Sequence, residues 1–517
     1  MRKLTLLLCF VSFLTNGQNI TVASGKSFTI EKTGAVTMSG NFSNAGTFIL
    51  NSDSDEFSSL IIGGSVTGNI TYNRYVNSVG TNEWDLIGAP VSGQSINSFV
   101  TANTSTLATN GATKAIGYYN NTDNTWTNYT TSTIVGAGNF PLGKGFQMAT
   151  NANGTGILSF TGAPTATNQT WTIIDNDAAN SGAGTRWNLV ANPFPSYIYG
   201  NANADSSHNF LTVNSDKLND SYEAIYGYDA DGSGYTVYNN TSAALRLAPG
   251  QAFMVASDNA ENDTISFTTA MRTTTGGDDL IVGRDPIDSF ELVLKLYEGD
   301  SEIDHTKFYF GDGLSLNLDP GYDAGHFNQG ASLMSRLVEE DEGVGLVINA
   351  MGLESVNDVV APLELNIEAG NNFRISIGTF NIDTAINVYL EDNVQETMTL
   401  LNDQDFELIA ENELSGVGRF FIHLTETVLS IDDKIETNYL NVFKADVNNF
   451  ITVEGLANQS NGTKLRLYTI RGKEVIFTTL NNTNNKQIIS TQGLSPGIYI
   501  VKLESGNILL TKKLFIK

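Results

Sequence analysis

Residues 20–50 read ITVASGKSFTIEKTGAVTMSGNFSNAGTFIL, where short apolar triplets recur every eight to ten residues with Gly or Asn between them. Such short, evenly spaced strands are typical of a β-solenoid, in which each rung stacks its inward apolar residues on the previous one. An antiparallel meander with short hairpins would give a similar pattern. We expect a β-solenoid-like region over residues 18–79, and neither interpretation implies catalysis.

Outward from this segment, the pattern is that of β-structure almost throughout. Runs of four to eight residues rich in Val, Ile, Thr, Phe and Tyr alternate with Gly, Asn, Asp and Ser, and long helical periodicity is absent. The segment SLMSRLVEE (332–340) is the best helix candidate, and it fits a strand equally well. At 517 residues the chain is too long for one core, so the sequence predicts an all-β protein of several domains.

Four segments recur in the same order, at an offset of 103 residues for the first pair and 107 for the last two. The pairs are WDLIGAPV (84–91) with WNLVANPF (187–194), IGYYNNTDNTW (116–126) with YGYDADGSGYTVY (226–238), PLGKGFQM (141–148) with APGQAFMV (248–255), and LSF (158–160) with ISF (265–267). An ordered series of this kind predicts an internal repeat. We interpret it as two copies of a β-sandwich, over residues 80–168 and 169–276.

The repeat places large aromatics at matching positions. Trp84 corresponds to Trp187, and Phe146 to Phe253. Large aromatics dominate cores, so we predict all four as core residues, with a sugar-stacking platform as the alternative for the tryptophans. We expect Gly145 or Gly250 to lie in a turn or at a point where two backbones approach closely, because glycine has no side chain.

Charge divides the chain more sharply than hydrophobicity does. There are 28 Lys plus Arg against 55 Asp plus Glu, a formal net charge of −27, which would repel a phosphate backbone and makes nucleic acid a poor partner. Residues 1–276 contain 11 basic and 18 acidic residues, residues 277–430 contain 6 and 30, and residues 431–517 contain 11 and 7. Alternating strands such as FELVLKLY (290–297) predict an acidic β-sandwich over residues 277–430.

The first 17 residues have the pattern of a signal peptide. Arg2 and Lys3 precede an apolar run, which is followed by small or polar residues ending at Gly17. The run is shorter than the roughly 20 residues that a membrane span needs, so we expect cleavage rather than retention as an anchor. Cys9, the only cysteine, lies inside the run, so the mature chain would have no thiol and no disulfide.

The last 87 residues carry three linked motifs. They comprise Leu467, Tyr468, Gly472 and Lys473 in the first motif, Leu494, Gly497, Tyr499 and Val501 in the second, and Lys512 and Lys513 in the third. This pattern resembles the C-terminal sorting domain, type A, of the type IX secretion system. The resemblance implies an immunoglobulin-like β-sandwich over residues 431–517, with the secretion machinery and its sorting peptidase as partners.

One departure concerns the entry to this domain. Where the family usually has Val-Tyr-Pro-Asn-Pro, this chain has Val442 to Asp446 without either proline, so the entry turn is less rigid. The resemblance further implies passage through the periplasm to the extracellular face of a Gram-negative outer membrane, or release. Residues 20–428, with GNFSNAGTFIL (40–50) and LDPGYDA (318–324), are also similar to the passengers of adhesin-like surface proteins that carry this domain.

Motifs for catalysis are absent from the sequence. His208, His305, His326 and His423 are scattered without a zinc-ligand spacing, and there is no Gly-x-Ser-x-Gly elbow or phosphate loop. We therefore predict that the protein is not an enzyme. A glycoside hydrolase remains the alternative, because it needs only two carboxylates and the chain offers many pairs.

Calcium is the cofactor that the sequence suggests most directly. In DADGSG (229–234), Asp229, Asp231 and Ser233 alternate as in the first half of an oxygen-ligand loop, but Asn240 stands where the terminal Glu would be. The matching NNTDN (120–124) has one acid, which favours a plain hairpin turn. A weaker candidate site comprises Asp312, Asp319 and Asp323.

The sequence thus predicts a secreted or cell-surface modular protein made of a short β-solenoid, repeated β-sandwiches and a C-terminal immunoglobulin-like β-sandwich. Its role would be structural or adhesive, with surface glycans or other cells as candidate partners. A glycan-binding module and a polysaccharide-acting hydrolase are the alternative functions.

Overall fold

A computed structural model gives the fold of the chain. It describes residues 19–516 except 80–83, 153, 178–183, 230–233, 259–261, 278–289, 328–329, 383–384, 427–439, 445–449, 458, 460–461, 496 and 507. The predicted signal peptide and Cys9 lie outside the described residues. Strands account for 51% of the structure and helices for 7%, which confirms the all-β prediction. No helix in the described part of the chain is long and apolar enough to cross a membrane.

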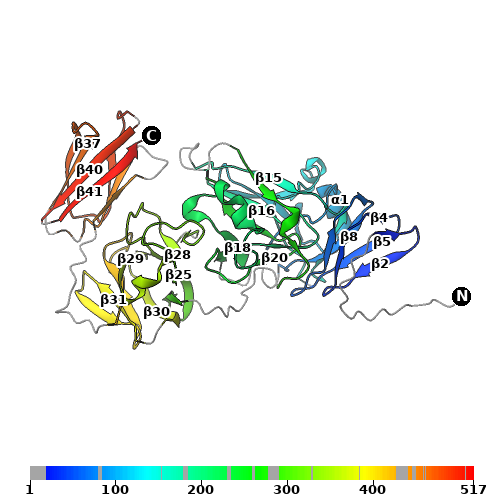
Figure 1. Cartoon of the computed structure of the whole chain (residues 1–517), viewed down its shortest axis with the longest axis horizontal. Coiled ribbons are helices and arrows are strands. Elements are labelled where there is room, and N and C mark those ends of the chain that lie inside the picture. The colour runs from blue at the N-terminus through cyan, green and yellow to red at the C-terminus, as the bar shows by residue number, and fades with distance from the viewer. Residues whose placement is uncertain are drawn as a thin grey trace.

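A parallel β-solenoid forms the N-terminal end of the elongated molecule (Figure 1). Its three stacks are β1 (Ile20–Val22), β4 (Phe42–Asn44) and β7 (Val66–Thr67); β2 (Ser27–Ile30), β5 (Thr47–Asn51) and β8 (Ile70–Tyr75); and β3 (Ala35–Met38) with β6 (Ser59–Ile62). Phe28 lies opposite Phe48 with the ring centroids 4.9 Å apart, and Leu50 lies opposite Tyr72. Apolar residues of one rung therefore stack on the next, as the sequence rhythm predicts.

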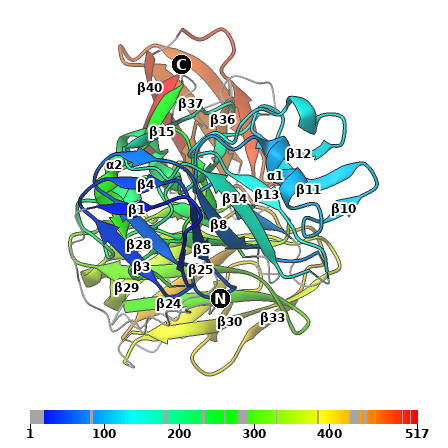
Figure 2. The same ribbon diagram turned by 90° about the vertical axis from the view of Figure 1, so that its right-hand side faces the viewer.

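The first unit, residues 84–162, continues directly from the solenoid. Its elements are β9 (Asp85–Ile87), α1 (Ile96–Ala102), β10 (Thr109–Asn110), β11 (Thr113–Asn120), β12 (Thr125–Thr130), η1 (Ile134–Gly136), β13 (Phe146–Met148) and β14 (Ile157–Gly162). Five strands form a sheet, in which β12, β11, β13 and β9 are neighbours in this order and the short β10 also pairs with β11, while β14 pairs with β8 of the solenoid. The β11–β12 hairpin projects from the side of the molecule (Figure 2).

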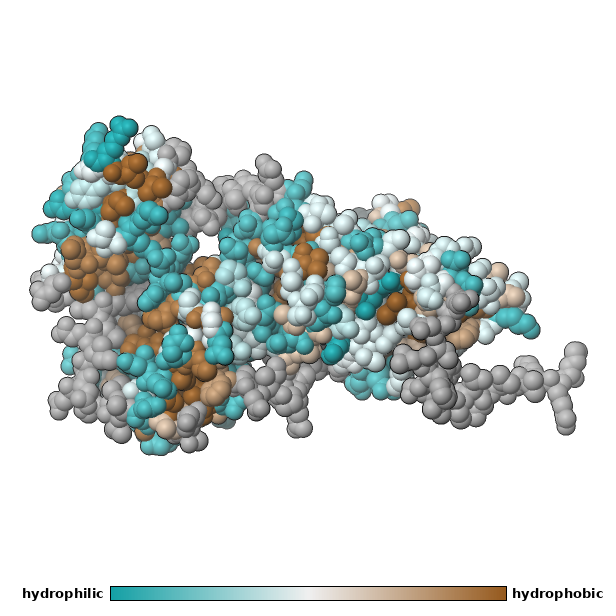
Figure 3. All heavy atoms as spheres, viewed as in Figure 1, coloured by the Kyte–Doolittle hydropathy of each residue, from teal (hydrophilic) through white to brown (hydrophobic). Residues whose placement is uncertain are grey.

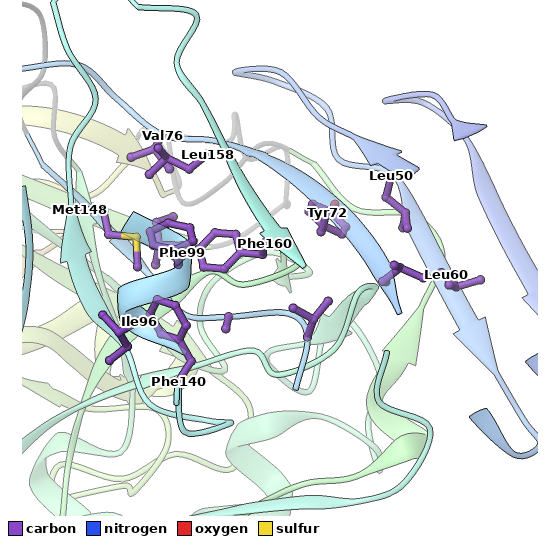
Figure 4. Close-up of a cluster of buried hydrophobic side chains, with 14 of the residues drawn as sticks. Leu50, Leu60, Tyr72, Val76, Ile96, Phe99, Phe140, Met148, Leu158 and Phe160 are labelled. Carbon is purple, nitrogen blue, oxygen red and sulfur yellow. The ribbon is translucent and has the colours of Figure 1, made fainter. Parts of the chain in front are cut away.

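The solenoid and the first unit share one core. Figure 4 shows the rings of Phe99, Phe140 and Phe160 gathered around α1, with Tyr72 and Leu50 continuing the cluster into the solenoid. The Phe99 and Phe160 centroids are 4.5 Å apart, and those of Phe99 and Phe140 are 5.2 Å apart. The border predicted between residues 79 and 80 thus falls inside a continuous apolar core.

The second unit, residues 169–267, has the same plan as the first. Its elements, with the short segments that follow, are β15 (Gln169–Ile173), β16 (Trp187–Ala191), β17 (Tyr197–Tyr199), α2 (Phe210–Asn214), η2 (Ser215–Lys217), η3 (Asp220–Tyr222), β18 (Ile225–Asp229), β19 (Gly234–Tyr238), β20 (Arg246–Leu247), β21 (Ala252–Ala256), β22 (Asp263–Phe267), η4 (Thr269–Met271) and β23 (Arg272–Thr273). The sheet order β19-β18-β21-β16 matches the order β12-β11-β13-β9 of the first unit. Val190 lies opposite Phe253 just as Ile87 lies opposite Phe146.

The two units contact each other through a reciprocal pair of backbone hydrogen bonds. The amide of Gly88 donates to the carbonyl of Gly250 at 2.7 Å, and the amide of Ala191 donates to the carbonyl of Gly143 at 2.9 Å. Gly143 and Gly250 both have positive φ, of +84° and +71°, which glycine adopts without strain. A Cβ on Gly88 would lie 2.3 Å from the Cβ of Ala191, so the boundary has room for one methyl group.

The acidic barrel, residues 290–426, is a single curled sheet of 11 strands that nearly closes on itself. Its elements are β24 (Phe290–Glu298), β25 (Ser301–Gly311), β26 (Ala324–Gly325), β27 (Ser332–Ser335), β28 (Leu346–Gly352), η5 (Leu353–Asn357), β29 (Asp358–Asn366), β30 (Asn372–Asn381), β31 (Asn387–Asp392), β32 (Thr397–Leu400), β33 (Phe406–Ile409) and β34 (Phe420–Thr425). The strands predicted as a sandwich thus belong to one continuous sheet rather than to two separate layers. The candidate helix at 332–340 begins as β27, because its buried residues pair with β29.

The tail sandwich, residues 440–516, lies at the end of the molecule opposite the N-terminus (Figure 1). Its strands are β35 (Asn441–Phe443), β36 (Phe450–Glu454), β37 (Thr463–Thr469), β38 (Glu474–Leu480), β39 (Gln487–Ser490), β40 (Gly497–Ser505) and β41 (Ile508–Ile516). They form two sheets, β35-β36-β39 and β38-β37-β40-β41, which enclose an apolar core of their own.

Candidate functional site

A cavity of about 540 Å³ lies where the first unit, the second unit and the acidic barrel meet. Six aromatic side chains line this junction pocket: Tyr119 and Trp126 from the first unit, Trp187, Tyr222 and Tyr235 from the second, and Phe327 from the barrel. The volume is in the range of small-molecule sites, which are lined mainly by apolar and aromatic groups.

Rings that line the pocket pack against an apolar cluster that joins the three modules. Leu86 of the first unit, Leu189 and Met254 of the second, and Ile348 of the barrel belong to it. The buried Tyr226 hydroxyl donates to the carbonyl of Gly325 in the barrel at 2.8 Å. The pocket therefore exists only when the three modules are packed together.

Trp187 is held at the pocket by three other rings. Its centroid lies 4.6 Å from that of Tyr226, 4.4 Å from that of Phe327 and 5.5 Å from that of Tyr222, all in edge-to-face geometry. Such contacts fix the orientation of the indole. Trp187 remains partly exposed and lines the cavity.

The prediction that both tryptophans are core residues therefore needs correction. Trp84 is also only partly buried and packs against Ala108, Ala115 and Ala149. Phe146 and Phe253, by contrast, are 1% and 0% exposed. Trp84 directly precedes β9 and Trp187 is the first residue of β16, where a side chain can contact the core on one side and solvent on the other.

The rim of the pocket carries neutral hydrogen-bonding groups. The Tyr119 hydroxyl donates to Asn124 Oδ1 at 2.9 Å and lies 2.8 Å from Thr185 Oγ1. Burial raises the pKa of Tyr119, Tyr222 and Tyr235, so these phenols stay protonated at neutral pH. Together they supply hydroxyl and amide groups beside aromatic faces.

The charged groups of the pocket are paired with one another. Arg186 Nη2 lies 3.1 Å from Asp177 Oδ2, and its guanidinium sits 5.4 Å from the centroid of Tyr222. His326 Nε2 lies 2.9 Å from Oδ2 of Asp304, a buried barrel residue outside the lining. Within the lining, Arg186 and Asp177 thus form one ion pair.

Of the calcium residues predicted at 229–233, Asp229 is the one that the structure describes, through its backbone. Asp229 ends β18 and pairs with Gly234, while Asp231 and Ser233 lie outside the described residues, so this site stays a prediction. In the described part of the chain no three His, Cys, Asp or Glu side chains are placed to hold a metal.

The weaker calcium candidate is a hydrogen-bonded loop. Asp323 is buried, and its carboxylate accepts from the amides of Asp319 and Ala350, both at 2.7 Å. Burial raises the pKa of Asp323 to about 7. Asp319 accepts from the amide of Ser315 at 2.7 Å, and Asp312 is exposed at the end of β25. The buried Asp323 and the partly buried Asp319 therefore shape the loop through these hydrogen bonds.

The predicted sorting residues gather on neighbouring strands of the tail sandwich. Leu467, Val501 and Lys512 lie side by side on β37, β40 and β41. Gly472 adopts a φ of +79° in the β37–β38 turn, and Lys473 follows it. Tyr468 of β37 and the exposed Lys513 of β41 flank Ile500 of β40. The remaining residues of the motifs are the partly buried Leu494, Gly497 at the start of β40, and Tyr499, whose hydroxyl donates to the carbonyl of Ser495 at 2.8 Å.

Two family models match the chain. Residues 10–423 match a family described as "Domain of unknown function (DUF8693)". The chain belongs to this family. Residues 445–517 match the "Secretion system C-terminal sorting domain", which confirms the type IX resemblance, and no curated protein matches the chain.

The two matches separate the candidate site from the sorting domain. The junction pocket lies wholly within the DUF8693 region, whereas the sorting motifs lie in the tail sandwich. The sorting domain indicates interaction with the type IX machinery and export to the cell surface or the extracellular space. Figure 3 shows one face of the whole molecule. The middle of the molecule is largely polar on this face, whereas apolar residues gather over the tail sandwich and the barrel.

Sequence reasoning missed most of the pocket. Of its aromatic side chains, only Trp187 was singled out, with a sugar platform as the alternative to a core role. Tyr119, Trp126 and Tyr235 lie on the two repeated hairpins, and this clustering of rings on equivalent hairpins is the signal that could have pointed to a shared surface.

Proposed function

We propose that the chain is an adhesive protein that acts outside the cell and binds a glycan in the junction pocket. The observation that carries this proposal is the six-ring lining, contributed by three modules, with neutral hydroxyl and amide groups at its rim. Sugar rings have apolar C–H faces and hydroxyl edges. Aromatic faces can contact the former while the rim groups hydrogen-bond to the latter.

Charge favours a neutral ligand. The protein has a formal net charge of −27, which disfavours the approach of an anionic polymer. Arg186 is the cation closest to such a ligand, and Asp177 already neutralises it. A neutral polysaccharide or glycan chain is therefore the expected ligand class.

The lining supports binding rather than hydrolysis. Among the described residues that line the pocket, Asp177 is the one carboxylate, and it is paired with Arg186. Glycoside hydrolysis commonly uses two carboxylates flanking the scissile bond. A polysaccharide hydrolase remains the second candidate function, and its catalytic carboxylates would have to lie outside the pocket lining.

The experiment is a glycan array probed with the full chain, followed by titration of any neutral glycan that binds. Trp126 is 37% exposed and lines the pocket, so Trp126→Ala should weaken binding at least tenfold without changing the melting temperature. Phe290→Ala is the matched control, because Phe290 is an exposed ring, 44% accessible, outside the lining. Equal affinity in Trp126→Ala and wild type would contradict the proposal.

The adhesive role is tested separately with beads coated with the full chain. Adhesion to cells or polysaccharide surfaces should be inhibited by the glycan identified on the array and reduced by Trp126→Ala. Adhesion that is unaffected by both would assign the adhesive role to another surface.

A further inference from the structure

A buried ionic cluster joins the acidic barrel to the tail sandwich. Arg336 follows β27 and is 1% exposed. Its Nη2 lies 2.9 Å from Asp341 Oδ2, and its Nη1 lies 2.9 Å from Glu364 Oε2, both within the barrel. The same Nη1 lies 3.3 Å from Glu454 Oε2 on β36 of the tail, and Glu454 is also 1% exposed.

Two polar side chains of the tail meet the same barrel loop. Asn441 Nδ2 donates to the carbonyl of Asp341 at 3.1 Å and to its Oδ2 at 3.0 Å. Lys512 Nζ donates to the Asp341 carbonyl at 2.6 Å. Asp341 is therefore the centre of the contact.

An aromatic ring fills the space beside these polar groups. A Cβ on Gly343 would lie 2.1 Å from the ring of Phe443, so this ring packs directly on the Gly343 backbone. The Arg336 guanidinium lies 5.7 Å from the centroid of the same ring. Beyond the cluster, Asn485 of the tail donates to the carbonyl of Val417 in the barrel.

Charge is complementary across the contact. The barrel loop reads EEDE over residues 339–342, whereas residues 431–517 have four more basic than acidic residues. Burial lowers the pKa of Lys512, and the neighbouring Asp341 and Glu342 oppose this shift. Separation of the two domains would take Glu454 away from Arg336 and Lys512 away from Asp341, while Arg336 keeps Asp341 and Glu364, and Glu454 keeps Lys486. A buried charge that loses one partner is costly, so these contacts favour the joined state.

We propose that the tail sandwich is latched onto the acidic barrel through this cluster, so that the sorting domain is carried in one fixed orientation against the DUF8693 region. Asp341 is the docking point on the barrel, and Asn441, Glu454 and Lys512 are the docking residues of the tail. Lys512 thus has a role in this chain that its sorting motif does not assign. The proposal is independent of the junction pocket.

Removal of the tail would change the surface of the barrel. Arg336 would keep Asp341 and Glu364, while Asp341 would lose its contacts with Lys512 and Asn441. Glu339, Glu340 and Glu342 are exposed even with the tail in place, so Asp341 is the acidic residue of this loop that the tail covers.

The test measures the distance between the two domains in the full chain. Cys9→Ser leaves no other cysteine, so spin labels can be placed at Ala369→Cys in the barrel and Lys473→Cys in the tail, both exposed turn positions. Pulsed electron spin resonance should give one narrow distance distribution in this background. A broad distribution would overturn the proposal.

Matched variants then locate the latch. Asn441→Ala with Lys512→Gln should broaden the distribution, whereas Lys513→Gln, which alters the adjacent exposed lysine of β41, should leave it narrow. Glu454→Gln should also broaden it, whereas Lys486→Gln should not, because Lys486 pairs with Glu454 from within the tail at 3.0 Å. Hydrogen exchange of both cores verifies that each variant stays folded. Narrow distributions in all folded variants would refute the latch.

Discussion

The first and second units have the same strand order and the same register, yet they face different neighbours. The first unit pairs β14 with β8 and shares its core with the solenoid. The second unit pairs β22 with its own β15 and turns its β16–β21 face toward the barrel. The same arrangement of strands thus covers the end of the solenoid in the first unit and lines the junction pocket in the second.

Equivalent positions acquire different roles through these neighbours. Trp84 packs on three alanines, while Trp187 is surrounded by rings from two modules. Gly88 occupies the position that Ala191 has in the second unit, and only one of them can carry a methyl group at the boundary. The shared plan therefore determines the strands, and the local neighbours determine the function of each side chain.

The largest expected effect comes from the core phenylalanines that the two units share. Phe146→Ala and Phe253→Ala each remove a ring that is buried almost completely, at an expected cost of about 3–5 kcal/mol. Because the units are joined by the reciprocal Gly88–Gly250 and Ala191–Gly143 hydrogen bonds, either variant should lower the unfolding temperature of both units together. Calorimetry of the full chain measures this, and an unchanged transition for the other unit would show that the copies unfold independently.

The next largest effect distinguishes the two tryptophans. Trp187→Ala removes three edge-to-face contacts, each worth about 0.5–1.5 kcal/mol, and should cost more stability than Trp84→Ala. Trp187→Ala should also abolish glycan binding, whereas Trp84→Ala should leave it unchanged. Thermal unfolding and titration with the array-selected glycan test both statements. Equal stability losses, with binding retained in both variants, would remove the distinction between the units.

The sequence predicts the local features of both units better than their surroundings. Short-range patterns are sufficient for the solenoid rungs, for the strands that contain Ile87 and Val190, and for the tail motifs around Leu467. The junction pocket brings together Tyr119, Tyr235 and Phe327, which are far apart in the sequence and come from three modules. Periodicity carries no information on which faces of separate modules meet, so neither this pocket nor the Arg336–Glu454 contact could be predicted.

A smaller effect tests the boundary between the units. Gly88→Ala places a methyl group against Ala191 and should cost about 1–3 kcal/mol, the usual range for overpacking. Ala191→Gly added to Gly88→Ala exchanges the methyl group across the boundary and should restore part of the lost stability. Denaturant unfolding of the single and double variants measures the coupling. Strictly additive losses would mean that the two residues do not compete for the same space.

The smallest expected effect concerns a carboxyl that the second unit has and the first lacks. Glu223 follows η3. Tyr226 pairs with Met254 as Gly117 pairs with Gln147, so the matching residue of the first unit is Lys114. The Oε1 atom of Glu223 lies 3.1 Å from the position that a Cβ on Gly321 of the barrel would take. The carboxyl of Glu223 is therefore buried where the second unit meets the barrel. Burial, with the nearby Asp220, raises the pKa of Glu223 to about 7.

The sign of the pH dependence follows from this shift. An unfolded Glu ionises near pH 4.3, so between about pH 4 and pH 7 the folded state holds a proton that the unfolded state has lost. Stability should therefore fall as the pH rises through this window and level off above it. Glu223→Gln keeps the neutral form and should flatten the fall, leaving a remainder from Asp323, whose pKa burial also raises to about 7. Melting temperatures of wild type and Glu223→Gln from pH 5 to pH 8 measure this effect, and we expect the two proteins to differ by a few degrees at pH 8. If the melting temperature changed with pH equally in both proteins, the Glu223 carboxyl would be in contact with solvent.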